Sequence, residues 1–124
     1  MVVYMKNMLM IMIILLAITS HAELTEWQAN RIADAIYKVE GGAKTRYPYG
    51  IKSVVTTDPR HVCLNTIKNN YRRWINQTNE SDYLVFLGNR YCPPASDYQG
   101  NRRWIKNMRI ILRDLAIDKP PRAK

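Results

Sequence analysis

One carboxylate in this sequence stands where a purely structural residue would not be expected. Glu40 lies four residues after Ile36, on or beside the apolar face of a predicted helix, in its last turn and directly before two glycines. The negative end of the helix dipole and partial burial both favour the protonated carboxyl group. This is the form that a general acid needs near neutral pH. In the alternative interpretation, Glu40 turns outward and pairs with Lys44 or Arg46.

Few other residues suggest chemistry of a known design. The chain has only two histidines and two cysteines, and the spacing of His21, His61, Cys63 and Cys92 matches no zinc-binding pattern. It also lacks a glycine-rich phosphate loop, which argues against the usual nucleotide-dependent enzymes. We therefore expect neither a metal nor a cofactor.

The first 22 residues have the pattern of a secretory signal peptide. Lys6 precedes an unbroken apolar run over residues 8–18, and small residues stand at the −3 and −1 positions of a cleavage site after Ala22. The alternative is a membrane anchor, but a helix that crosses a bilayer needs roughly 20 apolar residues, and this run is shorter. We therefore expect a periplasmic or secreted protein that meets the membrane only during export.

Export would place both remaining thiols in an oxidising compartment. Cys63 and Cys92 lie in the predicted mature part of the chain, where a disulfide would help to stabilise so small a domain. We expect these two residues to be joined. The alternative is a pair of buried free thiols.

The rest of the chain, residues 23–117, is expected to form one mainly helical domain, followed by a flexible tail over 118–124. Thr25 and Gln28 form a capping box before the first helix, and the two glycines after Glu40 end it. Asp58 and Pro59 mark the start of a second helix. Ser81 is expected to cap a short third helix.

The apolar residues of these segments recur at helical spacing and predict the core. The three tryptophans fall on such stripes, so we interpret them as core residues. The stripes consist of Trp27, Ile32, Ala35, Ile36 and Val39 in the first helix, Cys63, Ile67, Tyr71, Trp74 and Ile75 in the second, Leu84, Phe86 and Leu87 in the third, and Trp104, Ile105, Met108, Ile111, Leu112 and Leu115 in the last.

Residues 47–56 interrupt the helical pattern between the first two helices. They are rich in β-branched and aromatic residues and are bounded by turn formers, which predicts a short hairpin or an extended loop. The expected fold class is therefore mainly α, or α+β with a small irregular lobe after the first helix.

Two segments around Glu40 resemble the catalytic stretch of the lysozyme-like superfamily. They are residues 36–42 (IYKVEGG) and 47–51 (YPYGI), and the pattern is most similar to soluble lytic transglycosylases and goose-type lysozymes. Residues 86–93 (FLGNRYCP) and the helix that follows are similar to the late part of such domains. The resemblance implies a lysozyme-like α+β fold with a sugar cleft, and peptidoglycan as the substrate.

The same resemblance implies roles for individual residues. Glu40 would be the catalytic acid and base. A transglycosylase needs only this one carboxylate, because the substrate's N-acetyl group assists at the anomeric carbon and its 6-hydroxyl closes an anhydro ring. Asp58 is the best candidate for the second carboxylate that a hydrolase would need. The implied substrate-binding residues are Tyr47, Tyr49, Gly50, Ile51, Ser53, Asn89 and Tyr91.

The net charge of +9 fits a protein that works on an acidic bacterial envelope. The expected partners are peptidoglycan glycan strands, with envelope or secretion-channel proteins as further candidates, and the chain is expected to be a monomer. Nucleic acid is the rival partner, but we discount it because an exported protein rarely meets it. Two alternatives to the enzyme stay open: a noncatalytic glycan-binding module of the same fold, and a small basic secreted effector.

Overall fold

The computed structural model describes residues 23–52, 55–117 and 119, and within them the fold is mainly α-helical. The predicted signal peptide (1–22), Ser53 and most of the predicted tail lie outside the described residues. The helices are α2 (Glu26–Val39), α3 (Pro59–Ile75), α4 (Tyr83–Tyr91) and α5 (Tyr98–Ile111), with two single 3-10 turns, η1 (Gly42–Lys44) and η2 (Pro48–Gly50).

Each helix begins at a side chain that caps its first backbone amides. The capping box at Thr25 is confirmed, since its hydroxyl accepts from Gln28 N and Gln28 Oε1 accepts from Thr25 N. Asp58 caps α3 as predicted, with Pro59 in the first position. The prediction of Ser81 as a cap is wrong. Asp82 caps α4 instead, because its Oδ1 accepts from Leu84 N and Val85 N.

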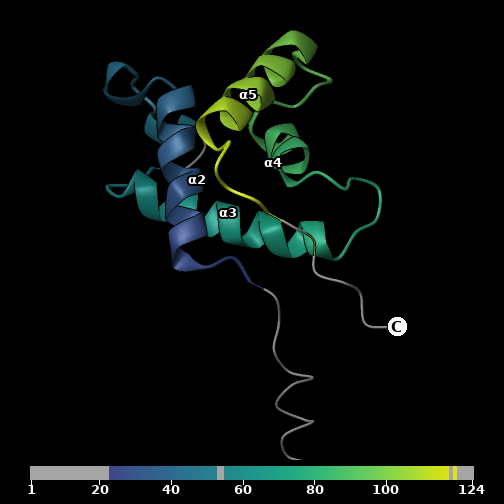
Figure 1. Cartoon of the computed structure of the whole chain (residues 1–124). Helices are drawn as coiled ribbons and strands as arrows, with labels where there is room; N and C mark the ends of the chain where they lie inside the picture. The colour runs from purple at the N-terminus through teal and green to yellow at the C-terminus, as the bar shows by residue number, and fades with distance from the viewer. Residues whose placement is uncertain (1–22, 53–54, 118, 120–124) are drawn as a thin grey trace, which may run out of the picture.

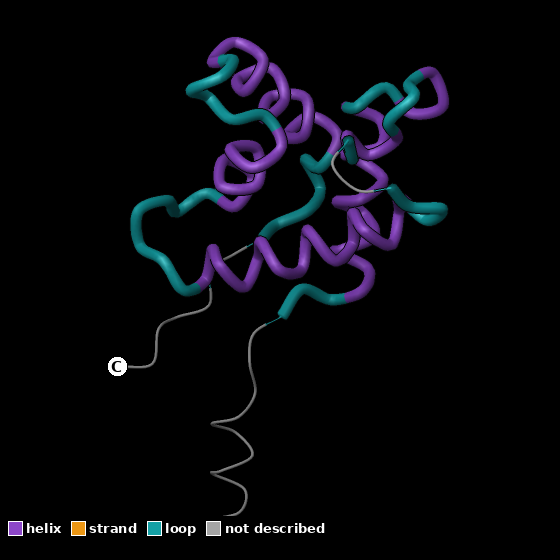
Figure 2. The backbone as a smooth tube through the Cα atoms, turned by 180° about the vertical axis from the view of Figure 1, so that it is seen from behind, coloured by secondary structure: helices purple, strands orange, loops and turns teal. Residues whose placement is uncertain are grey.

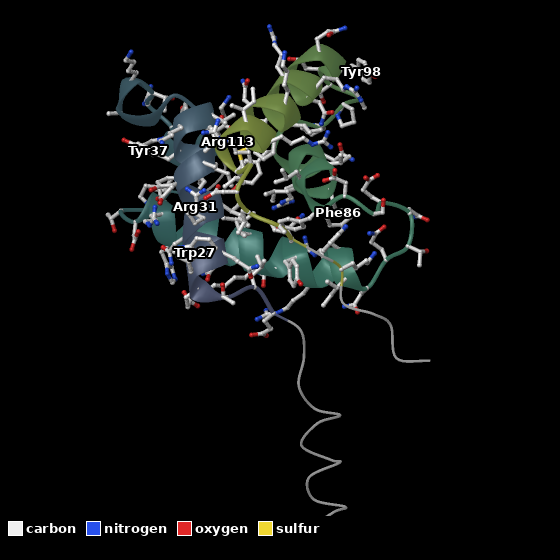
Figure 3. All side chains as sticks on the ribbon, viewed as in Figure 1. Trp27, Arg31, Tyr37, Phe86, Tyr98 and Arg113 are labelled. Carbon is white, nitrogen blue, oxygen red and sulfur yellow. The ribbon has the colours of Figure 1, made fainter. Side chains whose placement is uncertain are left out.

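The helices enclose one apolar core. Figure 1 shows α2 packed across α3, with α4 and α5 stacked beside each other on the same side of α3. Trp74 and Trp104 are buried as predicted, but Trp27 is 60% exposed and lies at the outer edge of α2 (Figure 3). Trp27 is the second residue of α2, and its ring stays in solvent. The Arg31 guanidinium lies 5.9 Å from the centre of this ring.

A small lobe over residues 40–58 connects α2 to α3. The backbone seen from behind in Figure 2 contains helices and loops but no strand among the described residues, so the hairpin alternative for residues 47–56 finds no support there. The physical reason lies in η2: Tyr49 and Gly50 both adopt a left-handed backbone, with φ of 63° and 67°. This turn is incompatible with an extended strand.

None of the helices in the described part of the chain is both long and apolar enough to cross a membrane.

Candidate functional site

Glu40 closes α2 and presents its side chain at the junction of the helical core and the small lobe. Its backbone N–H donates to Ile36 O at 2.9 Å, and Gly41 then leaves the helix in a left-handed conformation (φ 100°). The side chain is half-buried. In the described residues, no ion pair joins Glu40 to Lys44 or Arg46, so the outward-turned alternative is not adopted.

A tryptophan from the last helix holds one oxygen of this carboxylate. The indole Nε1–H of Trp104 donates to Glu40 Oε1 at 3.0 Å, across 64 positions of the sequence. Trp104 is only 6% exposed, and a buried indole N–H needs an acceptor. Trp104 was predicted as a core residue alone, so sequence reasoning missed its polar role. The signal that could have found it is the need of any buried tryptophan for such a partner.

Gly50 covers the carboxylate from the small lobe. A Cβ atom at this position would lie 2.9 Å from Glu40 Cδ and 3.0 and 3.1 Å from its two oxygens. These distances are too short for a side chain, so a glycine is what allows η2 to approach the carboxylate so closely. The structure thus places Gly50, one of the implied substrate-binding residues, directly against Glu40.

The Tyr49 ring is buried between the η2 turn and the helices α2 and α3. Its ring is 8% exposed, and its centre lies 5.2 Å from that of Tyr37. Its hydroxyl accepts from Arg60 Nη1 at 3.1 Å. Packing against α2 and α3 therefore buries the ring of Tyr49, which the resemblance implies as a substrate-binding residue.

Arg60 is a site residue that sequence reasoning missed. Besides Tyr49, its guanidinium contacts Asp34 Oδ1 and Asn30 Oδ1 of α2, both at 2.8 Å. The hydrogen bonds to Tyr49 and Asp34 raise the pKa of Arg60 further above its ordinary value. Arg60 thus ties the first turn of α3 to α2 and to the turn that carries Gly50.

Tyr91 reaches the site through Trp104. The two rings stack with centres 5.4 Å apart and planes 12° apart, and the Tyr91 hydroxyl lies 3.5 Å from Cys63 Sγ. Burial raises the pKa of Tyr91 well above its ordinary value. The structure therefore places Tyr91, which the resemblance implies as a substrate-binding residue, against the indole that holds Glu40.

The predicted disulfide between Cys63 and Cys92 is absent. Both cysteines are free, Cys63 buried and Cys92 half-buried. Tyr91 occupies the space beside the Cys63 sulfur, and consecutive residues at a helix end point in different directions, so Cys92 does not face it. Burial raises the pKa of the Cys63 thiol to about 11.

The remaining predicted site residues are scattered. Tyr47 is 39% exposed and lies beside Arg46 and Lys52, and Ile51 is half-buried against the core. Asn89 is exposed, and its Oδ1 accepts from Asn101 Nδ2 at 3.1 Å. In the described residues, no hydrogen bond or ion pair joins these side chains to Glu40.

Asp58, the candidate second carboxylate, is engaged elsewhere. Its Oδ1 accepts from His61 N at 3.0 Å as the cap of α3. Among the described residues, no group of three His, Cys, Asp or Glu side chains could hold a metal ion. The site therefore consists of one carboxylate held by an indole N–H and a glycine turn.

Comparison with models of known protein families gives no match, and comparisons with curated proteins and with solved structures give none either.

Proposed function

We propose that this protein is an exported enzyme of the lytic transglycosylase type, which cleaves the MurNAc–GlcNAc bond of peptidoglycan with Glu40 as the single general acid and base. The observation that carries the proposal is the setting of this carboxylate, held by Trp104 on one side and covered by Gly50 on the other. A carboxylate at a helix C-terminus is unfavourable for stability, and such placements are typical of residues retained for function.

The geometry suits transfer of one proton at a defined atom. Trp104 occupies Oε1, while Oε2 has no hydrogen-bond partner among the described residues. In the proposed reaction, a protonated Oε2 gives its proton to the glycosidic oxygen as the bond to the anomeric carbon breaks. The substrate's N-acetyl group assists at that carbon. The carboxylate then takes the proton of the 6-hydroxyl as this oxygen closes the anhydro ring.

The role that Asp58 plays as a helix cap favours this reaction over hydrolysis. Inverting hydrolysis requires a partner carboxylate at ~6.5–9.5 Å, and retention through a covalent intermediate requires one at ~5–5.5 Å. Asp58, the candidate for that partner, accepts a hydrogen bond from His61 N at its Oδ1 as the cap of α3. The acceptor in the second step is therefore proposed to be the sugar's own hydroxyl.

The chain's charge supports the choice of substrate. A net charge of +9 would concentrate the protein on an anionic cell envelope, where glycan strands are abundant. A periplasmic or secreted location belongs to the same proposal.

Product analysis tests the proposal. The purified protein is incubated with peptidoglycan sacculi, and the soluble products are identified by mass spectrometry. We expect muropeptides with a 1,6-anhydro end, lighter by one water than the products of hydrolysis. Reducing ends alone would make the protein a hydrolase and overturn the single-carboxylate mechanism. Binding of sacculi without release would leave only the glycan-binding module.

A further inference from the structure

A groove between α4 and α5 lies apart from the Glu40 site. It has a volume of about 640 Å³, and neither Glu40, Gly50 nor Trp104 lines it. It extends along α5 from Tyr98, at the end of that helix away from α2 (Figure 3), to Ile110. Its apolar walls come from Val85 of α4, Pro94, and Ile105 and Ile110 of α5.

The rim of this groove is strongly cationic. It carries Arg102, Arg103, Lys106 and Arg109, and no acidic residue lines it. Only Arg109 is paired, with Asp82 at 2.7 Å, while the other three form no ion pair within the described part of the chain. An occupant with negative charges would therefore meet three unneutralised cations.

The groove also leaves large apolar side chains in solvent. Tyr98 is 59% exposed and Ile110 is 56% exposed, and they lie at opposite ends of the part of α5 that lines the groove. The Arg102 guanidinium lies 5.9 Å from the centre of the Tyr98 ring, so cation and ring form one composite surface. A binding partner gains most from this groove when it supplies both apolar and anionic groups.

We propose that this groove binds an acidic segment of a partner protein that inserts apolar side chains between α4 and α5. The two chemistries are met together by a peptide with carboxylates beside leucine-like residues. A purely anionic polymer, such as a teichoic acid, would leave the apolar walls in water. The chain's own last residues are basic (Lys119, Arg122 and Lys124), so charge disfavours them as occupant. The proposal is independent of the proposed glycan cleavage.

Nuclear magnetic resonance with a synthetic peptide tests the proposal. The probe is an amphipathic peptide with glutamates and leucines at helical spacing. One matched peptide replaces the glutamates by glutamines, and another replaces the leucines by serines. Added to isotope-labelled protein, the probe is expected to shift the amide signals of Val85, Ile105, Lys106 and Ile110. The two matched peptides are expected to bind with an affinity at least about tenfold lower than that of the probe.

Variants distinguish binding in the groove from a general effect of the protein's net charge. Lys106→Glu and Ile110→Asp are expected to weaken binding of the probe about tenfold each. Arg73→Glu makes the same charge change as Lys106→Glu on an exposed part of α3 and is expected to leave the affinity within about twofold.

Four results would overturn the proposal. In the first, Arg73→Glu weakens binding of the probe as much as Lys106→Glu does. In the second, the glutamine peptide binds as tightly as the probe. In the third, no peptide shifts the amide signals, and in the fourth, vesicles containing phosphatidylglycerol shift them but the probe does not.

Discussion

Helix α5 borders two regions that differ in how their polar groups are held: in one they are buried and hydrogen-bonded, and in the other they lie in solvent. One side of the helix directs the buried Trp104 indole to Glu40, where every contact is fixed at hydrogen-bond distance or by packing. Its other side lines an open groove with Arg102 and Lys106, whose charges have no partner in the described residues. A single helix thus supplies a preorganised donor to one site and solvated cations to the other.

This difference in how the polar groups are held suits the two regions to different roles. In the proposed reaction, the fixed oxygen and the glycine turn would confine proton transfer to one atom, because reacting groups must be held in a narrow range of geometries. Solvated cations beside apolar walls offer little geometric restraint but attract and orient a charged partner. Substitutions that damage the Glu40 site should therefore leave the groove intact. Substitutions in the groove should likewise leave the Glu40 site intact.

Among the variants that keep the Glu40 side chain itself, Gly50→Ala is expected to have the largest effect, because its new Cβ would meet the carboxylate directly. The new Cβ would lie 2.9 Å from Glu40 Cδ, in a residue with φ of 67°. We expect a loss of about 1–2 kcal/mol of stability from the strained backbone. The Glu40 carboxylate, at the flexible end of its side chain, would shift to relieve the clash, so we expect muropeptide release to fall about 100-fold. Chemical denaturation and a sacculus assay measure both.

Gly41→Ala is the matched control for this change. Its φ of 100° is also in the left-handed region, but a Cβ there would be 3.6 Å or more from its neighbours. It should lose similar backbone stability and keep most of the activity. Equal loss of activity in both variants would show that the contact of Gly50 with Glu40 is irrelevant.

Trp104→Phe is expected to have the next largest effect. It keeps an aromatic ring against Tyr91 but removes the N–H that donates to Glu40 Oε1. We expect muropeptide release to fall about tenfold and the free energy of unfolding to fall by about 1–3 kcal/mol. The fall should appear in kcat more than in KM, and full activity would contradict the proposed role of the indole.

Arg60→Met tests whether the turn must be anchored from α3. It removes the hydrogen bonds to Tyr49, Asp34 and Asn30 while keeping an apolar stem. We expect activity to fall several-fold and stability to fall by about 1–2 kcal/mol. Arg72→Met, which removes an exposed arginine paired with Glu23 at 3.4 Å, is the control and should change neither. Identical behaviour of the two variants would remove Arg60 from the site.

The smallest effect at neutral pH is expected from the buried Cys63 thiol, which changes stability only at high pH. Burial raises the pKa of Cys63 from 9.0 to about 11. The folded protein therefore holds this proton more tightly than the unfolded chain. Its contribution to stability is complete below about pH 9 and is lost as the pH rises to about 11. Cys63→Ala should flatten the dependence of the free energy of unfolding on pH in this window.

Alkylation tests both cysteine thiols directly. With no reductant present, the native protein should react at Cys92, which is half-buried, while Cys63 reacts only after unfolding. A protein that resists alkylation at both residues until it is reduced would contain the disulfide after all.

The parts of the molecule that could be predicted from sequence depend on signals a few residues apart. The capping box at Thr25, the start of α3 at Asp58 and the end of α2 beside Glu40 are of this kind. The choice of Asp82 over Ser81 as the cap of α4 was missed because adjacent residues can both act as caps and only the backbone geometry selects one.

The contacts that define the site depend on packing and could not be predicted. The hydrogen bond from Trp104 to Glu40 spans 64 residues, and Arg60 meets Tyr49 only because α3 crosses α2. The left-handed backbone of Tyr49 excludes a strand at this position, which was one of two expectations for the segment, and nothing in the residue type indicates such a backbone. The cysteines were misjudged because burial beside Tyr91 decides their state.

The most direct measurement compares Glu40→Gln with Asp58→Asn in the release of muropeptides from sacculi. Glutamine keeps the shape of the side chain but cannot donate a proton as the acid does, while asparagine caps a helix about as well as aspartate. We predict that Glu40→Gln abolishes release with no loss of thermal stability, and that Asp58→Asn retains release. Retained activity in Glu40→Gln, or its loss in a folded Asp58→Asn, would contradict a mechanism with Glu40 as the only carboxylate.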